Sequence, residues 1–122
     1  MDFNSFFAKI KVNCPYIDKQ LIQNAYDFAF NCHQGQKRKS GQDFLIHPLE
    51  TALILSRLKL DSKTIAAGIL HDTMDHSNIT EQELVQKFGP EISFIVSALT
   101  KLENVKYKDS EKEREQESLR RF

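Results

Sequence analysis

The stretch IAAGILHDTMDHS, residues 65–77, passes from an apolar helical pattern directly into a run of histidines and aspartates. Its apolar residues recur at the spacing of one helix face: Ile65, Ala66, Ile69 and Leu70. Ala67 and Gly68 are small, so a second helix can approach this one closely. The stretch therefore predicts a helix over residues 64–75 that packs in a helical core and ends in reactive side chains.

Helical spacing continues through most of the chain, and the sequence contains no strand pattern, internal repeat or low-complexity segment. The fold class that we predict is all-α, a compact bundle of five or six helices. Capping and turn residues mark the helix boundaries. Asp18 precedes a second helix and Gly35 follows it, Pro48 starts a third, and Asp61 or Ser62 precedes a fourth. A capping box of Thr80 and Glu83 starts the next helix, Gly89 ends it, and Pro90 opens a last one.

The two ends of the chain differ from its middle. A helix over residues 3–12 carries Phe3, Phe6 and Phe7 on one face, and these side chains need cover, which favours self-association. From Glu103 onward the sequence is mostly charged, so we predict a mobile tail over residues 103–122. The chain then reads as a single domain, 1–122, that is cut short at its C-terminus.

Composition excludes several classes of protein. The 122 residues suit one domain, and 17 basic residues balance 17 acidic ones, so broad adhesion to nucleic acid or to a membrane surface is not expected. No run of about 18 apolar residues predicts a membrane span, and the N-terminus lacks a signal-peptide pattern. The two cysteines match no zinc or CxxC spacing, so we expect a reduced, cytoplasmic protein.

The run HDTMDHS, residues 71–77, is a candidate metal site. Asp72 and His76 are four residues apart and share a helix face, as do His71 and Asp75. Imidazole and carboxylate ligands together suit manganese, iron or zinc. A further ligand must come from elsewhere, and His47 in the LIHP junction is the best candidate, followed by His33. The alternative is a helix end whose polar side chains are solvated or act as caps.

The segment HQGQKRKSG, residues 33–41, is a second constellation. Lys37, Arg38, Lys39 and Ser40 lie between glycines in a stretch without periodicity, which predicts a loop. Such a loop can present cations and backbone N–H groups to phosphate, and Arg38 can stack on a base. The alternative is a solvated basic loop, because the segment lacks the GxxxxGKS pattern of a P-loop.

Two segments taken together resemble the HD hydrolase domain of the RelA/SpoT homologues. They are HQGQKRKSGQDFLIHPLETALIL (33–55) and IAAGILHDTMDHSNITEQELVQKFGPEISFIVSALTKL (65–102). The resemblance covers roughly residues 18–122. It implies an all-α HD-domain bundle that binds Mn²⁺ and removes the 3′-pyrophosphate of the alarmones ppGpp and pppGpp, the nucleotides of the stringent response.

By position, the resemblance assigns the metal ligands to His47, His71 and Asp72. It assigns alarmone binding to the loop, with Arg38 against the guanine base and Lys39 and Ser40 beside it, while Lys37 would counter pyrophosphate charge. The catalytic positions that follow the metal pair fall on Asp75 and His76.

Two departures from the family pattern stand out. First, Asp75 and His76 stand where the family has a Glu-Asp pair. Second, the family's fourth metal ligand is an aspartate on a later helix, which we expect beyond the end of this chain. Asp109 does not match that aspartate. One hypothesis is a small or split alarmone hydrolase, completed by a homo-oligomer or another polypeptide. The others are a non-catalytic HD module that binds alarmone or protein, and a phosphohydrolase for another nucleotide.

Overall fold

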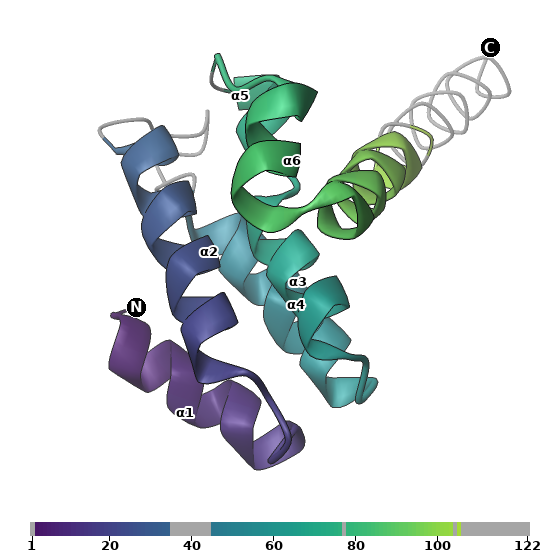
Figure 1. The fold of residues 1–122 in the computed structure, drawn as a ribbon. Coiled ribbons are helices and arrows are strands. Elements are labelled where there is room, and N and C mark those ends of the chain that lie inside the picture. Colours follow the sequence, from purple (N-terminus) through teal and green to yellow (C-terminus); the bar gives the residue numbers. More distant parts are fainter. Residues whose placement is uncertain (1, 35–44, 77, 104, 106–122) are drawn as a thin grey trace, which may run out of the picture.

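The computed structural model describes residues 2–34, 45–76, 78–103 and 105, and of Asp75 and His76 it describes the backbone alone. The predicted all-α class is confirmed, because these ranges form helices without a strand (Figure 1). The labelled elements are α1 (Phe3–Asn13), α2 (Lys19–His33), α3 (Ile46–Arg57), α4 (Ser62–Leu70), α5 (Thr73–His76) and α6 (Glu81–Phe88). A further helix over residues 90–103 follows α6. Within the described ranges, no helix is long and apolar enough to cross a membrane.

Side-chain caps set most helix boundaries. The carboxylates of Asp18 and Asp61 accept hydrogen bonds from backbone N–H groups in the first turns of α2 and α4, at 3.2 and 3.0 Å. The Thr80 hydroxyl accepts one in the same way at the start of α6. Gly89 ends α6 with φ at 90°, a left-handed conformation that glycine adopts without strain. The caps at Asp18, Asp61 and Thr80 and the helix end at Gly89 are confirmed, with Asp61 rather than Ser62 as the cap of α4. Gly35 lies outside the described residues.

The third helix begins earlier than predicted. Its first residue is Ile46, and Pro48 is the third residue of the helix rather than the first. Proline is tolerated there because the N–H groups of the first turn have no partner within the helix. The shift places His47 inside the first turn of α3.

The helix predicted over residues 64–75 is divided. α4 spans Ser62–Leu70, a turn follows at His71 and Asp72, and α5 is a single short helix. Two side chains hold the turn, because His71 Nδ1 lies 2.6 Å from the Gly68 carbonyl oxygen and the Thr73 hydroxyl donates to the Leu70 carbonyl at 2.7 Å. These side chains take carbonyl oxygens that a continuous helix would use for its own backbone bonds.

The aromatic face of α1 is covered within the chain. Phe6 is fully buried, and Phe7 is nearly so. Phe3 stacks on Phe7, with 5.5 Å between ring centroids, and meets the edge of Tyr26 on α2 at 5.4 Å. α2 and the core therefore supply the cover that these phenylalanines need, and self-association stays a prediction.

α3 and α4 pack closely at Gly68. A Cβ atom at this position would lie 2.7 Å from Leu55 Cδ1 and 3.5 Å from the Cα of Ala52. The absence of a side chain therefore allows α4 to lie directly against α3, as the small residues of this stretch predict. The two helices are joined by residues 58–61 and run side by side in opposite directions (Figure 1).

Hydrogen bonds join the turn after α1 to the turn after α3. The buried Cys14 thiol donates to the Ser56 carbonyl oxygen at 3.3 Å, and the Tyr16 hydroxyl donates to the Leu60 carbonyl oxygen at 2.7 Å. Lys59, which adopts a left-handed φ of 59°, donates to a backbone carbonyl oxygen of α1 at 3.0 Å. This turn-to-turn junction fixes α1 to the end of α3 and α4 that lies away from His47 and His71.

The helix over residues 90–103 packs on the bundle by one face only. Ile92 and Val96 are buried, whereas Phe94 is 72 % exposed. The Thr100 hydroxyl donates to the His71 carbonyl oxygen at 2.7 Å. Glu103, which the sequence assigns to the charged tail, is thereby carried toward the turn at His71, and residues 106–122 of that predicted tail lie outside the described residues.

Replacing Phe6 with alanine tests whether α1 belongs to the core. Deleting a fully buried phenyl ring leaves a cavity, so Phe6→Ala should lower the free energy of unfolding by about 3–5 kcal/mol. Phe94→Ala is the matched control, because its exposed ring should cost no more than about 0.5 kcal/mol. Urea unfolding followed by circular dichroism measures both, and equal losses would contradict the burial of α1.

Candidate metal centre

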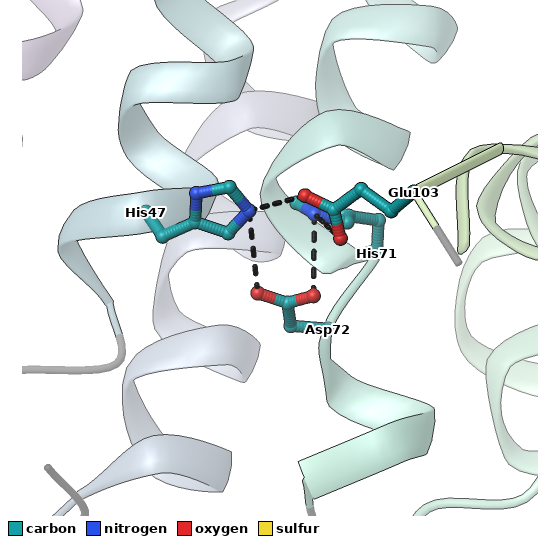
Figure 2. Close-up of side chains that lie close together, drawn as sticks. All are labelled: His47, His71, Asp72 and Glu103. Carbon is teal, nitrogen blue, oxygen red and sulfur yellow. Dashed lines mark hydrogen bonds and ion pairs between the residues drawn. The ribbon is translucent and has the colours of Figure 1, made fainter. Parts of the chain in front are cut away.

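Four side chains from three separate parts of the chain converge at one point (Figure 2). His47 comes from the first turn of α3, His71 and Asp72 from the turn after α4, and Glu103 from the end of helix 90–103. Each offers one donor atom, and these atoms all lie within 4.8 Å of one another. We refer to His47, His71, Asp72 and Glu103 as the four-residue cluster.

The backbone fixes the orientation of the His71 ring. Its Nδ1 lies 2.6 Å from the Gly68 carbonyl oxygen, which has no proton to give, so Nδ1 carries the proton of this hydrogen bond. When the ring is neutral, Nε2 is therefore the unprotonated nitrogen, and it faces the cluster. A metal-binding histidine is held in the same way, because the hydrogen bond at one ring nitrogen determines which nitrogen faces the ion.

The buried Nε2 of His71 is the atom that best tests whether a cation fits. It makes no hydrogen bond with any described residue, although it lies 3.2 Å from an Asp72 oxygen and 3.2 Å from a Glu103 oxygen. An imidazole lone pair that faces two carboxylates is unfavourable unless a positive charge lies between them. The donor set therefore fits a bound cation.

His47 closes the other side of the cluster. Its Nε2 is hydrogen bonded to the Glu103 carboxylate and lies 3.9 Å from Asp72 Oδ2. The centroids of the His47 and His71 rings are 5.2 Å apart, and the rings meet edge to face. Both carboxylates thus contact both histidines, and a single ion could be reached from all four side chains.

The Glu103 carboxylate is held in its charged form. Burial raises the pKa of Glu103, but the charge of His71 and the hydrogen bond and charge of His47 together outweigh it, and the pKa lies below its usual value. Metal ligands must be deprotonated, so this electrostatic environment suits a ligand. Two imidazoles with two carboxylates are typical of sites for manganese, iron or zinc.

The structure brings together the three predicted metal ligands, His47, His71 and Asp72. His33, the second outside candidate, is buried at the end of α2 and is not part of the cluster. Asp75 and His76 have their backbone in α5, but their side chains lie outside the described residues. The predicted loop residues Lys37, Arg38, Lys39 and Ser40 also lie outside them.

Sequence reasoning missed Glu103. The resemblance led us to expect the fourth ligand beyond residue 122, whereas Glu103 supplies a fourth donor from within the chain. One signal was present, because helical spacing continues through SALTKLE and places Thr100 and Glu103 on the same face. That spacing does not say where the helix points, so it could not identify the partner of Glu103.

A cavity of about 620 Å³ lies apart from the cluster, between α2 and α6. Phe28 and Phe88 meet edge to face in its wall, with Lys87 above the Phe28 ring. None of the four cluster residues lines it. The four-residue cluster and this cavity therefore occupy separate places in the described structure.

Comparison with known proteins identifies the domain. A family model described as an HD domain matches residues 25–122. The chain belongs to the HD domain family. HD domains are metal-dependent, and the four-residue cluster is a group that could hold the ion.

The curated relatives of this HD domain are RelA/SpoT-type proteins. A GTP pyrophosphokinase of Myxococcus xanthus is 48 % identical over 88 residues, which is 72 % of this chain and 12 % of that protein. A guanosine-3′,5′-bis(diphosphate) 3′-pyrophosphohydrolase of Aquifex aeolicus is 42 % identical over 92 residues, 75 % of this chain and 13 % of that protein.

A third relative matches almost the whole chain. The bifunctional (p)ppGpp synthase/hydrolase SpoT of Escherichia coli is 34 % identical over 120 residues, which is 98 % of this chain and 17 % of that protein. The HD domain therefore spans less than a fifth of the length of these relatives. The predicted relation to RelA/SpoT proteins is confirmed.

Metal binding by the HD domain should depend on the buried ligands. With Mn²⁺ at about 100 times its dissociation constant, the wild type should gain about 2.7 kcal/mol in the free energy of unfolding. Asp72→Asn should lose most of this gain, because an amide is a much weaker ligand than a carboxylate. Glu50→Gln, an exposed change one turn from His47 and outside the cluster, should keep it.

Calorimetric titration of Mn²⁺ and unfolding with and without the ion measure the two effects. Equal affinity for Mn²⁺ in Asp72→Asn and Glu50→Gln would contradict a metal site at the cluster.

Proposed function

We propose that this HD domain is a metal-dependent phosphohydrolase that removes the 3′-pyrophosphate of guanosine-3′,5′-bis(diphosphate) and of its pentaphosphate analogue. The observation that carries the proposal is the convergence of two histidines and two carboxylates, with the buried Nε2 of His71 facing both carboxylates. The relatives support the substrate class, since one is a (p)ppGpp 3′-pyrophosphohydrolase by name and another a (p)ppGpp synthase/hydrolase.

The proposed reaction is a hydrolysis at the 3′ position. Water attacks the phosphorus atom joined to the 3′ oxygen, the bond between that phosphorus and the 3′ oxygen breaks, and the 3′ oxygen takes up a proton. The products are pyrophosphate and GDP, or GTP from the pentaphosphate. A divalent ion held by the cluster, for which we propose Mn²⁺, would supply Lewis-acid polarisation of a phosphate oxygen and acidify water.

The protein's own contribution begins with rigidity. The Gly68 carbonyl holds the His71 ring, and the Thr100 hydroxyl holds the backbone of the same residue. His71 and Asp72 are buried, so their donor atoms are confined to one geometry. Ligands held in this way do not need to reorganise during the reaction, which favours catalysis.

We assign substrate binding to the predicted loop over residues 33–41, which precedes α3 in the sequence. Arg38 would stack on the guanine base, with Lys39 and Ser40 beside it, and Lys37 would counter the charge of the pyrophosphate. The proximity of this loop to the cluster in sequence supports the assignment, because only a few residues separate Ser40 from His47.

We assign proton transfer to α5, directly after the metal pair. Asp75 would orient or deprotonate the attacking water, and His76 would exchange protons as an acid or a base. The backbone of α5 supports this assignment, because it continues from the turn that carries His71 and Asp72.

The alternative function is a non-catalytic HD module that binds alarmone or protein. The observation in its favour is the Asp75-His76 pair, which stands where the RelA/SpoT pattern has Glu-Asp. Aspartate is one methylene shorter than glutamate, and a misplacement of about 1 Å can reduce a rate on the order of 100-fold. Such a module would keep the metal ligands and lose turnover.

One paired measurement separates the two functions. The purified chain is incubated with Mn²⁺ and ppGpp, and released pyrophosphate and bound nucleotide are measured in parallel. Pyrophosphate release that disappears in His71→Ala supports the hydrolase. Stoichiometric binding of ppGpp without release supports the non-catalytic module, and the absence of both activities would contradict both.

Restoring the family residues should raise activity. In the double variant Asp75→Glu/His76→Asp, the longer carboxylate reaches one methylene further, and we expect pyrophosphate release to increase by up to about 100-fold. Initial rates at saturating Mn²⁺ give the comparison, and Asp109→Glu in the predicted tail is the control for an added methylene alone. A double variant no faster than the wild type would contradict the proposed roles of Asp75 and His76.

A further inference from the structure

The four ligands of the cluster are not equally accessible. The side chains of His71 and Asp72 are 1 % and 7 % exposed, and that of His47 is 30 % exposed. Glu103 is the most open, with 43 % of its side chain exposed. Among the described residues, the cluster therefore has a buried side, formed by His71 and Asp72 of the turn after α4, and a more exposed side, where Glu103 lies.

We propose that Glu103 is an exchangeable ligand, which occupies the open side of the metal centre and gives way to an oxygen of an incoming phosphate. This inference rests on the proposed metal centre and extends it. A catalytic zinc site keeps one position for water or substrate beside three protein ligands. Here His47, His71 and Asp72 make up three, and Glu103, the most exposed of the four, occupies the position that a substrate oxygen reaches most readily.

The attachment of Glu103 suits exchange. It comes from the last described turn of helix 90–103, and the Thr100 hydroxyl, one turn earlier, ties that helix to the His71 carbonyl. Rotation about the side-chain bonds of a glutamate can withdraw its carboxylate without moving this helix. Asp72 has a shorter, buried side chain and cannot leave in the same way.

The negative charge of Glu103 affects the binding of the metal and the binding of phosphate in opposite directions. The carboxylate of Glu103 is an anionic oxygen donor, as is a phosphate, so one can replace the other without changing the number of donors. While it remains in place, Glu103 repels an approaching phosphate, because like charges a few ångströms apart oppose each other. Glu103 should therefore strengthen the binding of the metal and weaken the binding of phosphate to the metal-loaded protein.

Glu103→Gln tests this pair of opposite effects. Mn²⁺ is titrated into the protein by calorimetry, and inorganic phosphate or pyrophosphate is then titrated into the Mn²⁺-loaded protein. Losing the negative charge should weaken Mn²⁺ binding by about tenfold and tighten phosphate binding by about tenfold. Glu103→Ala repeats the test without an amide oxygen, and Glu50→Gln is the matched control for loss of one carboxylate.

Each outcome decides the inference. Weaker Mn²⁺ binding together with tighter phosphate binding supports an exchangeable ligand. Weaker Mn²⁺ binding with unchanged or weaker phosphate binding makes Glu103 a permanent ligand and overturns the exchange. Unchanged binding of both in Glu103→Gln and Glu103→Ala shows that Glu103 is not a ligand, which also overturns it.

The probes keep this test separate from the proposed function. Inorganic phosphate and pyrophosphate bind without turnover, so the result does not depend on whether the chain hydrolyses ppGpp. If Glu103 behaves as an exchangeable ligand but ppGpp is not hydrolysed, the inference holds and the proposed function fails. If the titration detects no Mn²⁺ binding to the wild type, the inference and the proposed function both fail.

Discussion

The contact between α3 and α4 at Gly68 is the constraint on which the site depends. A Cβ atom at residue 68 would lie 2.7 Å from Leu55 Cδ1 and 3.5 Å from the Cα of Ala52, so α4 lies directly against α3 at this point. Because the helices run in opposite directions, the same contact brings the start of α3 beside the end of α4, and His47 meets His71 there. The Gly68 carbonyl also receives the His71 ring. Gly68 thus lies in the helix contact that brings the two histidines together, and its carbonyl orients one of them.

Features decided by neighbouring residues could be predicted from the sequence. The caps at Asp18, Asp61 and Thr80 depend on groups within three residues, and the all-α class follows from the spacing of apolar side chains. The pairing of His47 with His71 was different, because helical spacing alone left His33 as an alternative. Resemblance to a family of known organisation supplied the choice, and the packing of α3 on α4 agrees with it.

Two features were not predicted from the sequence, one decided by local hydrogen bonds and the other by tertiary contacts. The division between α4 and α5 arises because Thr73 and His71 bond to carbonyl oxygens of the preceding turn, and the residue types around it remain compatible with a continuous helix. The place of Glu103 depends on the direction in which helix 90–103 leaves the bundle, which the bond from Thr100 to a residue 29 positions earlier helps to fix. Composition alone placed Glu103 in a charged tail, because a single carboxylate carries no sign of its distant partners.

The turn-to-turn junction has a consequence for the size of the folding unit. The HD family match begins at residue 25, inside α2, yet Phe6 and Ile10 of α1 are fully buried and Cys14 bonds to the last turn of α3. A fragment trimmed to the matched region would lose residues 19–24 of α2 and uncover apolar surface that α1 now shields. The region matched by the family model is therefore smaller than the packed unit, and α1 covers the end of the bundle that lies away from the candidate metal centre.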